Sequence, residues 1–289
     1  MSSAAAKGFR VVAGDAGYKL LALKKDPTGE KHQYWFTDSL IKALKDRKTE
    51  GYRVLPSSFG SGVLGPAAVL ERLRDGEVAL DYHLIAAPLS DGFQNHLNDW
   101  SGKGFHLLTL APGGLMERTA GSSAQGSADR YVVLSTYLTG NMEMDVAKTV
   151  ARGYRVVAAA GVTYKMVVVL EKLAPGDPIP EYRLISTNRT GTLESEISAA
   201  SRQGYHMLPQ TLSALEKGHS WMLGPSGYEV AAIMEKRPGA APMDYKVLGT
   251  TQVATLNKEL DECEAAGWSI NQFIVSHRER VIVLEKPRQ

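Results

Sequence analysis

Residues 153–172 read GYRVVAAAGVTYKMVVVLEK, a glycine and an aromatic residue followed by two runs of β-forming residues. A turn near Gly161 separates the two runs, which predicts a β-hairpin. The same glycine–aromatic step, each time followed by a short apolar run, occurs at five other positions: Gly8, Gly51, Gly104, Gly204 and Gly267. We therefore interpret the chain as a tandem repeat.

The residues before each of the last five glycines have a helical period. The seventh and eleventh positions before the glycine are apolar, as Val146 and Met142 are before Gly153. This i, i+4 spacing places both side chains on one face of an amphipathic helix. The glycine then suits the residue just past the helix end, where a left-handed backbone is needed and a Cβ is unfavourable.

Another aromatic residue begins a predicted strand upstream of the helix. It precedes the aromatic residue of the glycine step by 23 residues in four repeats: Tyr82 to Phe105, Tyr131 to Tyr154, Tyr182 to Tyr205 and Tyr245 to Trp268. Each repeat is therefore a β-α-β-β unit, and it closes with a Glu–basic pair such as Glu171-Lys172. The first repeat, which starts near Phe9, lacks the opening β-α pair. This predicts six hairpins and five helices.

The predicted fold class is α+β, with six tandem β-α-β-β units of which the first is truncated. Third strands such as KMVVVLEK are continuous apolar runs, which are typical of strands covered on both faces. Helices cover one face of each sheet, so we expect neighbouring repeats to cover the other. The alternative is a closed ring that resembles an α/β propeller.

The repeats group into two halves of three. The first repeat resembles the fourth, and the second resembles the fifth through a shared Leu-Pro and a shared Leu-Gly-Pro. Between the halves, residues 119–129 (TAGSSAQGSAD) have the small, polar composition of a flexible linker. We predict a first half at residues 1–118 and a second half at residues 130–289.

The order of aromatic-led strand, helix, glycine–aromatic step and hairpin resembles a family of small bacterial domains, the domain of unknown function 4177. Tyr245 in DYKVLGTT and Trp268 in EAAGWSINQF carry the best matches. The resemblance covers most of the chain as tandem copies. It implies a fold and offers no catalytic residues.

Composition places the chain among ordinary folded proteins. It has 289 residues, 44% of them hydrophobic, and a net charge of +2, which argues against a nucleic-acid partner. No apolar run reaches the roughly 18 residues of a membrane helix, so we expect no membrane span. The start, MSSAAAKGFR, lacks a signal-peptide pattern, which predicts a cytoplasmic protein as written. An exported protein whose signal was replaced by Met has the same appearance.

We predict no metal site, no cofactor and no catalytic residue. The seven histidines match no zinc-binding pattern, and no acidic loop has the spacing of a calcium site. The glycine-rich residues 60–65, GSGVLG, lack the Lys-Ser/Thr of a phosphate-binding loop and are interpreted as a hairpin loop. Cys263 follows Leu256 and Leu260 at helical spacing, which places its thiol on the buried helix face.

A basic stripe on the second strands is the first candidate site. The second residue after the glycine lies opposite the aromatic residue in strand alternation. It is basic in five repeats: Arg10, Arg53, His106, Arg155 and His206. Such a stripe can bind an anion through charge-assisted hydrogen bonds. The alternative is a solvated face, or pairing with the glutamate that ends each third strand.

The inserts of the second and fifth repeats are the second candidate site. The residues that indicate ligand binding are Ser57, Ser58 and Phe59 in one insert and His219, Ser220 and Trp221 in the other. A tryptophan beside a histidine on a loop is a usual composition for a binding site. The alternative is that Trp221 folds back onto the sheet as a plug.

We therefore expect a non-enzymatic repeat scaffold that binds a protein or a small ligand through its hairpin loops. One alternative is an enzyme of the guanidino-modifying α/β-propeller type that uses Cys263 as its nucleophile. Another is a structural protein that forms homo-oligomers through unpaired strand edges near its N-terminus.

Overall fold

The computed structural model describes residues 5–16, 20–46, 49–62, 65–85, 92–110, 113–122, 126–137, 139–162, 164–220, 224–275 and 279–288, with the backbone alone at 62, 217–220 and 224–227. The chain divides into two compact halves, Met1–Arg130 and Tyr131–Gln289. In the segment predicted as a linker, Gly126 N donates a hydrogen bond to Gly102 O at 3.3 Å. This part of the segment therefore contacts the end of helix α3 (Phe93–Gly102).

The N-terminal half contains the first three repeats. The first repeat is the hairpin β1 (Phe9–Asp15) and β2 (Leu20–Lys25). The second repeat comprises β3 (Tyr34–Thr37), α2 (Leu40–Lys45), β4 (Tyr52–Val54), the 3₁₀ helix η1 (Pro56–Ser58), β5 (Gly60–Gly62) and β6 (Gly65–Arg72). The third repeat comprises β7 (Leu80–Ile85), α3, β8 (His106–Leu110) and β9 (Gly114–Thr119).

The C-terminal half contains the last three repeats. The fourth repeat comprises β10 (Tyr131–Thr136), α4 (Thr139–Val150), β11 (Tyr154–Val162) and β12 (Lys165–Lys172). The fifth comprises β13 (Tyr182–Thr187), α5 (Thr190–Ser201), β14 (Tyr205–Met207), β15 (Ser213–Ser220) and β16 (Gly224–Lys236). The sixth comprises β17 (Met243–Thr250), α6 (Val253–Ala265), β18 (Ser269–Val275) and β19 (Arg280–Pro287).

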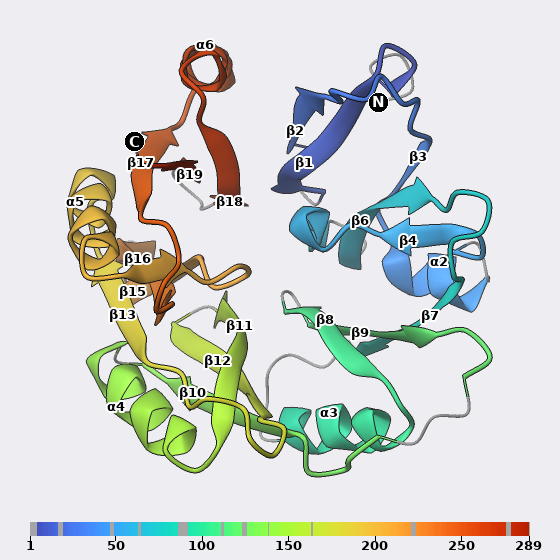
Figure 1. Ribbon diagram of the computed structural model, residues 1–289, viewed down its shortest axis with the longest axis horizontal. Coiled ribbons are helices and arrows are strands. Elements are labelled where there is room, and N and C mark those ends of the chain that lie inside the picture. The colour runs from blue at the N-terminus through green and yellow to red at the C-terminus, as the bar shows by residue number, and fades with distance from the viewer. Residues whose placement is uncertain are drawn as a thin grey trace. The chain divides into compact units, whose positions relative to one another are not determined.

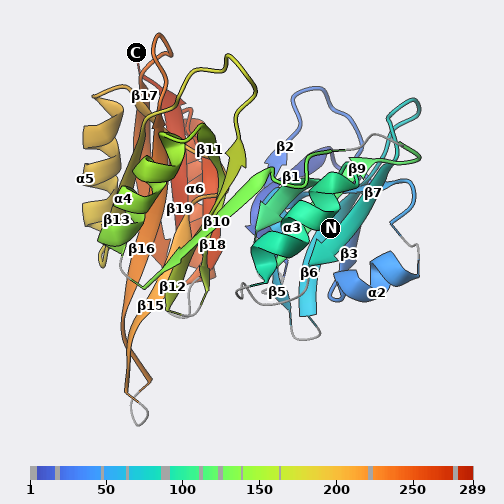
Figure 2. The same cartoon turned by 90° about the horizontal axis from the view of Figure 1, so that it is seen from below.

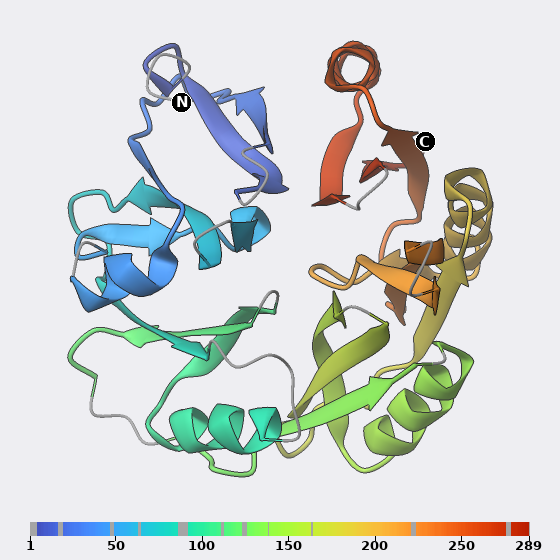
Figure 3. The ribbon, with the colours of Figure 1, turned by 180° about the vertical axis from the view of Figure 1, so that it is seen from behind.

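Each repeat forms its own antiparallel sheet, and the predicted β-α-β-β order is confirmed (Figure 1). The third strand lies in the centre of the sheet, with the first and second strands on either side, as in β10-β12-β11. The first repeat is the two-stranded sheet β1-β2, as its missing β-α pair predicts. Helices α4 and α5 lie against the sheets of their own repeats (Figure 1 and Figure 3).

The six glycines of the repeated step all have a left-handed backbone. Their φ angles lie between +76° and +88°, at Gly8, Gly51, Gly104, Gly153, Gly204 and Gly267. At Gly153, a Cβ would meet no atom within 4 Å, so conformation rather than space requires glycine. The chain closes the helix in the same way each time, as where Gly153 N bonds to Val150 O at 2.9 Å. The prediction that these glycines reverse the chain after a helix is confirmed.

Every second strand is interrupted at the same place, just after the third residue past the glycine. In the first, third, fourth and sixth repeats the interruption is a β-bulge, as between Val156 and Ala158. In the fifth repeat it is an excursion of five residues, 208–212, between the paired residues Met207 and Ser213. The second repeat has the same excursion at residues 55–59.

The central strands are buried on both faces, as predicted. In β16, Ala232 and Met234 contact α5 and the sixth repeat, whereas Ala231 and Ile233 contact the core of the fourth repeat. All four side chains are at most 1% exposed. One face of the sheet is therefore covered by the repeat's own helix and the following repeat, and the other by the preceding repeat.

A hydrogen bond from the backbone to a tyrosine hydroxyl joins consecutive repeats within each half. The hydroxyl of the first-strand tyrosine accepts from the backbone N–H three residues after the glycine of the preceding repeat. The four bonds are Val11 N to Tyr34 (3.1 Å), Val54 N to Tyr82 (2.9 Å), Val156 N to Tyr182 (3.0 Å) and Met207 N to Tyr245 (2.9 Å). We call this contact the tyrosine joint.

Helices of the C-terminal half add a second contact between repeats. Glu143 of α4 accepts a hydrogen bond from Leu184 N in the edge strand β13, at 3.3 Å. Glu194, at the same place in α5, accepts from Val247 N in β17, at 2.8 Å. These carboxylates satisfy backbone donors on strand edges that would otherwise be open to pairing.

Candidate binding site

Three side chains of the predicted basic stripe pair with the glutamate that ends the third strand. Arg53 Nε donates to Glu71 at 2.7 Å, and Arg155 Nη2 donates to Glu171 at 2.7 Å. The third pair joins His106 and Glu117 at 3.3 Å. The sequence left two alternatives to anion binding, a solvated face and pairing with the strand-end glutamate. For these three side chains the structure shows the pairing.

The remaining members of the stripe have other surroundings. Arg10 is exposed and lies opposite Lys24 in the β1-β2 ladder. His206 is 7% exposed, and its burial lowers the pKa of the imidazole. The five basic side chains therefore differ in burial and in partner, although the backbone places them at equivalent positions.

A histidine that the sequence did not single out extends the Arg53–Glu71 pair. His32 Nδ1 lies 2.7 Å from Glu71 Oε1, and His32 Nε2 lies 2.9 Å from Asp26 Oδ2. Each ring nitrogen of His32 therefore lies within hydrogen-bond distance of a carboxylate oxygen. Although burial opposes the shift, hydrogen bonds from Arg53 and His32 lower the pKa of Glu71.

Two of the three predicted site residues in the insert of the second repeat, Ser58 and Phe59, hold the fold together. Ser58 is fully buried, and its hydroxyl donates to Leu55 O at 2.7 Å and accepts from Val69 N at 2.9 Å. Phe59 packs against the core formed by α2 and β6. Ser57 is exposed on η1.

The excursion of the fifth repeat is held in a matching way. Thr211 is fully buried, and its hydroxyl bonds to Leu208 O at 2.7 Å and to Ile233 N at 3.2 Å. Gln272 of the sixth repeat adds three bonds, accepting from Thr211 N and Leu212 N and donating to Leu208 O at 2.8 to 2.9 Å. The shared Leu-Pro therefore marks a fixed excursion, with Ser58 and Thr211 as equivalent residues.

Beyond this excursion, the insert of the fifth repeat is a β-ribbon and not the loop that the sequence predicted. Strands β15 and β16 pair from Ser213 opposite Ala231 to Ser220 opposite Gly224, and the ribbon projects beyond the sheet (Figure 2). His219 and Ser220 lie in β15, but their side chains are not among those described. Trp221 lies outside the described residues.

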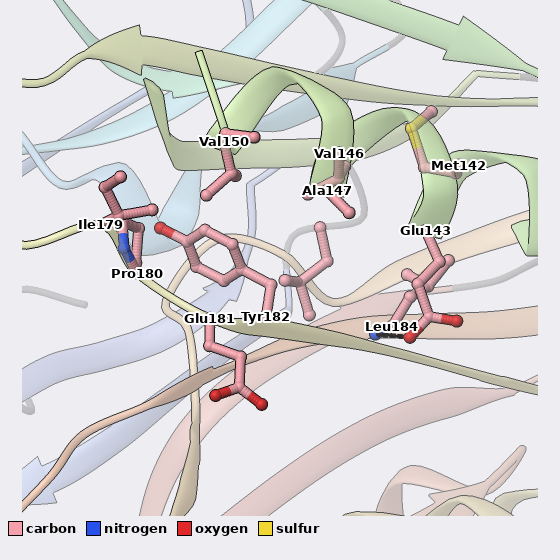
Figure 4. Close-up of a pocket in the computed structure, with 12 residues that line it drawn as sticks. Met142, Glu143, Val146, Ala147, Val150, Ile179, Pro180, Glu181, Tyr182 and Leu184 are labelled. Atoms are coloured by element: carbon pink, nitrogen blue, oxygen red, sulfur yellow. Dashed lines mark hydrogen bonds between the residues drawn. The ribbon is translucent and has the colours of Figure 1, made fainter. Parts of the chain in front are cut away.

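An apolar groove lies between α4 and β13, where the fourth and fifth repeats meet. Its volume is about 280 Å³, and the residues that line it come from both elements and from the segment before β13 (Figure 4). Met142, Val146 and Val150 line it from α4, and Tyr182 and Leu184 line it from β13. The groove is therefore built by the same two elements that form the repeat junction.

The equivalent junction between α5 and β17 has a methionine at the position of Pro180 and an added hydrogen bond. Met243, two residues before Tyr245, packs into the core, and Ser201 Oγ donates to its carbonyl oxygen. In the junction with the groove, the corresponding residues are Pro180 and Val150. Proline lacks the long side chain of methionine, which is consistent with open space at this position, and valine cannot make the hydrogen bond that Ser201 makes.

The rim of the groove is exposed and partly apolar. Ile179 is 64% exposed, and Ala147 and Ala151 are exposed on the helix side. Glu143 stands at the same edge, bound to Leu184 N (Figure 4). Sequence reasoning missed this site, although comparison of the fourth and fifth repeats shows its signal: Ala151 and Pro180 replace Arg202 and Met243.

Cys263 is buried, as its helical spacing predicted. It is 3% exposed and packs with Leu248 and Leu256, and Lys246 Nζ donates to its sulfur at 3.3 Å. A buried thiol among aliphatic side chains is a core residue and is poorly placed for attack on a substrate.

In the described part of the chain, no helix is both long enough and apolar enough to cross a membrane. Comparison with protein-family models, with curated proteins and with solved structures gave no match.

Proposed function

We propose that the protein is a non-enzymatic repeat scaffold that binds a partner through the groove between α4 and β13. The observation that supports this is the groove itself: about 280 Å³ of apolar space at a junction whose counterpart is filled by Met243. Several of the polar side chains at equivalent positions of the repeats are bound to one another, as in the Arg53–Glu71–His32 network. Such use of polar groups supports a scaffold more than a reaction centre.

The size and lining of the groove indicate its ligand class. A volume of about 280 Å³ accepts one aromatic or branched aliphatic group, as a partner side chain or as part of a small ligand. Burial of such a group contributes about 1.5–3 kcal/mol. The ligand is therefore an apolar group on a larger partner.

The groove can be tested with indole as a probe and an Ala147→Trp variant. Ala147 lines the groove from the exposed side of α4, so a tryptophan there covers the space without entering the core. We expect indole to shift the methyl resonance of Met142 with a dissociation constant on the order of 1 mM, as for a small apolar fragment. The Ala147→Trp variant should lose this shift.

Met144→Trp is the matched control, because Met144 lies on the same helix, is 55% exposed and does not line the groove. It should leave the indole shift unchanged. Absence of a Met142 shift at millimolar indole, or an equal response in the Ala147→Trp variant, would contradict the proposal.

The β15–β16 ribbon is a second candidate for partner contact. Beyond Val230, β16 has no pairing with β13, and within the described residues it pairs with β15 alone. The base of the ribbon packs on the fourth repeat, where Leu215 is 1% exposed, and from Lys217 onward the two strands pair only with each other within the described residues. A two-stranded extension of this kind adds little stability. Its projection from the sheet therefore supports a role in binding.

Replacement of both His219 and Trp221 by Ala tests this role. If the ribbon serves binding, the free energy of unfolding should change by less than about 1 kcal/mol, as for substitutions outside a core. A loss of about 3–5 kcal/mol would instead indicate that Trp221 is a buried plug, which would exclude it as a binding residue. Chemical denaturation distinguishes the two results.

The two other functions that the sequence left open have direct tests. An enzyme that used Cys263 would show rapid, saturable labelling of the thiol in the folded protein. Its burial to 3% supports slow labelling and thus the scaffold. Self-association would appear as a dimer or larger species in a mass measurement in solution. The likeness to domain of unknown function 4177 also remains a proposal, and it supports a scaffold because that family offers no catalytic residues.

A further inference from the structure

The first repeat presents an open strand edge where every other repeat has a strand. In the other five sheets, the first strand pairs with the central third strand. In the first repeat, β2 holds the place of that central strand, and in the described residues it pairs with β1 alone. One side of β2 therefore offers backbone groups for a further antiparallel strand.

The side chains of β2 are also less buried than those of the central strands in the completed sheets. In β6 and β12, six consecutive residues are buried. In β2 (LLALKK) none of the six is buried, and Leu23 is 38% exposed. The strand therefore has the apolar composition of a central strand without the covering of one.

The completed sheets show which residues fill this position. Three of the five first strands begin with an acidic residue and a tyrosine: Asp81-Tyr82, Glu181-Tyr182 and Asp244-Tyr245. The acidic residue pairs with a base at or beyond the end of the third strand, as Asp81 does with Arg118 at 3.2 Å and Glu181 with Lys236 at 2.9 Å. Two aliphatic residues follow at the fourth and fifth positions, counted from the acidic residue, as in DYHLI and EYRLI.

The first repeat keeps the basic residue of this pair. Lys25 lies opposite Phe9, just as Lys236 lies opposite Tyr205 in the fifth repeat. Lys25 is exposed at the end of β2. A lysine on an edge strand discourages neutral strands and favours a partner with a carboxylate at that position.

We propose that the open edge of β2 binds an extended segment of a partner protein with the pattern acidic–aromatic–x–aliphatic–aliphatic. The segment adds to β2 as an antiparallel strand, with its carboxylate on Lys25 and its two aliphatic residues opposite Ala22 and Leu21. Leu184 and Ile185 lie opposite Ile233 and Ala232 in the same way in the fifth repeat. Backbone hydrogen bonds give affinity, and the side-chain pattern gives specificity, as in other cases of strand addition. This surface belongs to the N-terminal half and does not depend on the groove.

The test uses the first strand of the fifth repeat, β13, as the probe: a fluorescent peptide with residues 180–188, PEYRLISTN. Its binding to the full-length protein is measured by fluorescence anisotropy. Lys25→Glu should weaken binding about tenfold, because an exposed ion pair becomes a repulsion. Lys31→Glu is the matched control, since Lys31 is exposed outside β2, and it should have no effect.

Further peptides test the mode of binding. A peptide with Glu181→Lys should bind poorly to the wild type and regain affinity for the Lys25→Glu protein. Two peptides are N-methylated at every second amide, one at the N–H groups that would face β2 and the other at the N–H groups that would face away from it. The first should not bind, and the second should bind like the unmodified peptide, because only alternate N–H groups of an added strand bond to β2. Equal binding of both N-methylated peptides, or equal affinity of the Lys25→Glu and Lys31→Glu proteins, would overturn the proposal. A dimer of the protein alone that Lys25→Glu dissociates would overturn it in favour of a second copy.

Discussion

Replacement of Tyr182 by Phe removes one hydroxyl from the tyrosine joint between the fourth and fifth repeats. That hydroxyl accepts from Val156 N at 3.0 Å and donates to Glu235 at 3.3 Å. Val156 is 3% exposed, so water does not replace the lost acceptor. An unpaired buried N–H costs about 1–3 kcal/mol, whereas the ring keeps its apolar contacts. We expect Tyr182→Phe to reduce the free energy of unfolding of the C-terminal half by about 1–3 kcal/mol.

Amide hydrogen exchange at Val156 gives the local measurement, and chemical denaturation gives the global one. In the variant, exchange at Val156 should become faster, because its N–H no longer has an acceptor. Tyr154→Phe is the matched control: Tyr154 contacts the core of the fourth repeat, and none of the hydrogen bonds found among the described residues involves its hydroxyl. Its effect should stay within about 0.5 kcal/mol. Unchanged exchange at Val156 together with unchanged stability in Tyr182→Phe would refute the joint as a source of stability.

Two glycines of the fourth repeat should respond in opposite directions. Gly153→Ala should lower the melting temperature, at a cost of about 1 kcal/mol for a left-handed position, whereas Gly140→Ala inside α4 should raise it; equal shifts would contradict the backbone argument. The N-terminal half should lose stability in acid, because hydrogen bonds hold the pKa values of Asp26 and Glu71 below those of the unfolded chain, 3.8 and 4.5. This contribution is present above about pH 4.5 and is lost as the pH falls through the lower folded values. Urea denaturation between pH 3 and 7 measures the loss, and His32→Ala should reduce its pH dependence.

The repeat and its elements were predictable from the sequence because they depend on local patterns. The i, i+4 stripe of Met142 and Val146 gave the helix, and the glycine step gave its end. Continuous apolar third strands predicted burial on both faces, which β16 confirms. Each of these signals lies within about 15 residues and needs no knowledge of a neighbouring repeat.

The sites were less predictable because they depend on contacts between repeats. The 23-residue spacing identified Tyr182 as a strand residue, but its bond to Val156 N follows only once two repeats are packed. The ribbon of the fifth repeat was mistaken for a loop because the sequence of β15, SALEKGHS, has no sustained apolar alternation. The groove is lined in part by Ala151 and Pro180, whose difference from Arg202 and Met243 is visible only when the fourth and fifth repeats are compared.

The donor of every tyrosine joint is a main-chain N–H, so the joint places no demand on the side chain at that position. The residue is valine in three joints and methionine in the fourth. Gain or loss of a whole repeat therefore leaves this hydrogen bond in place at the new boundary, whichever side chain stands at the donor position. Contacts made by side chains, such as that of Gln272 with Thr211 N, would change with the neighbouring repeat.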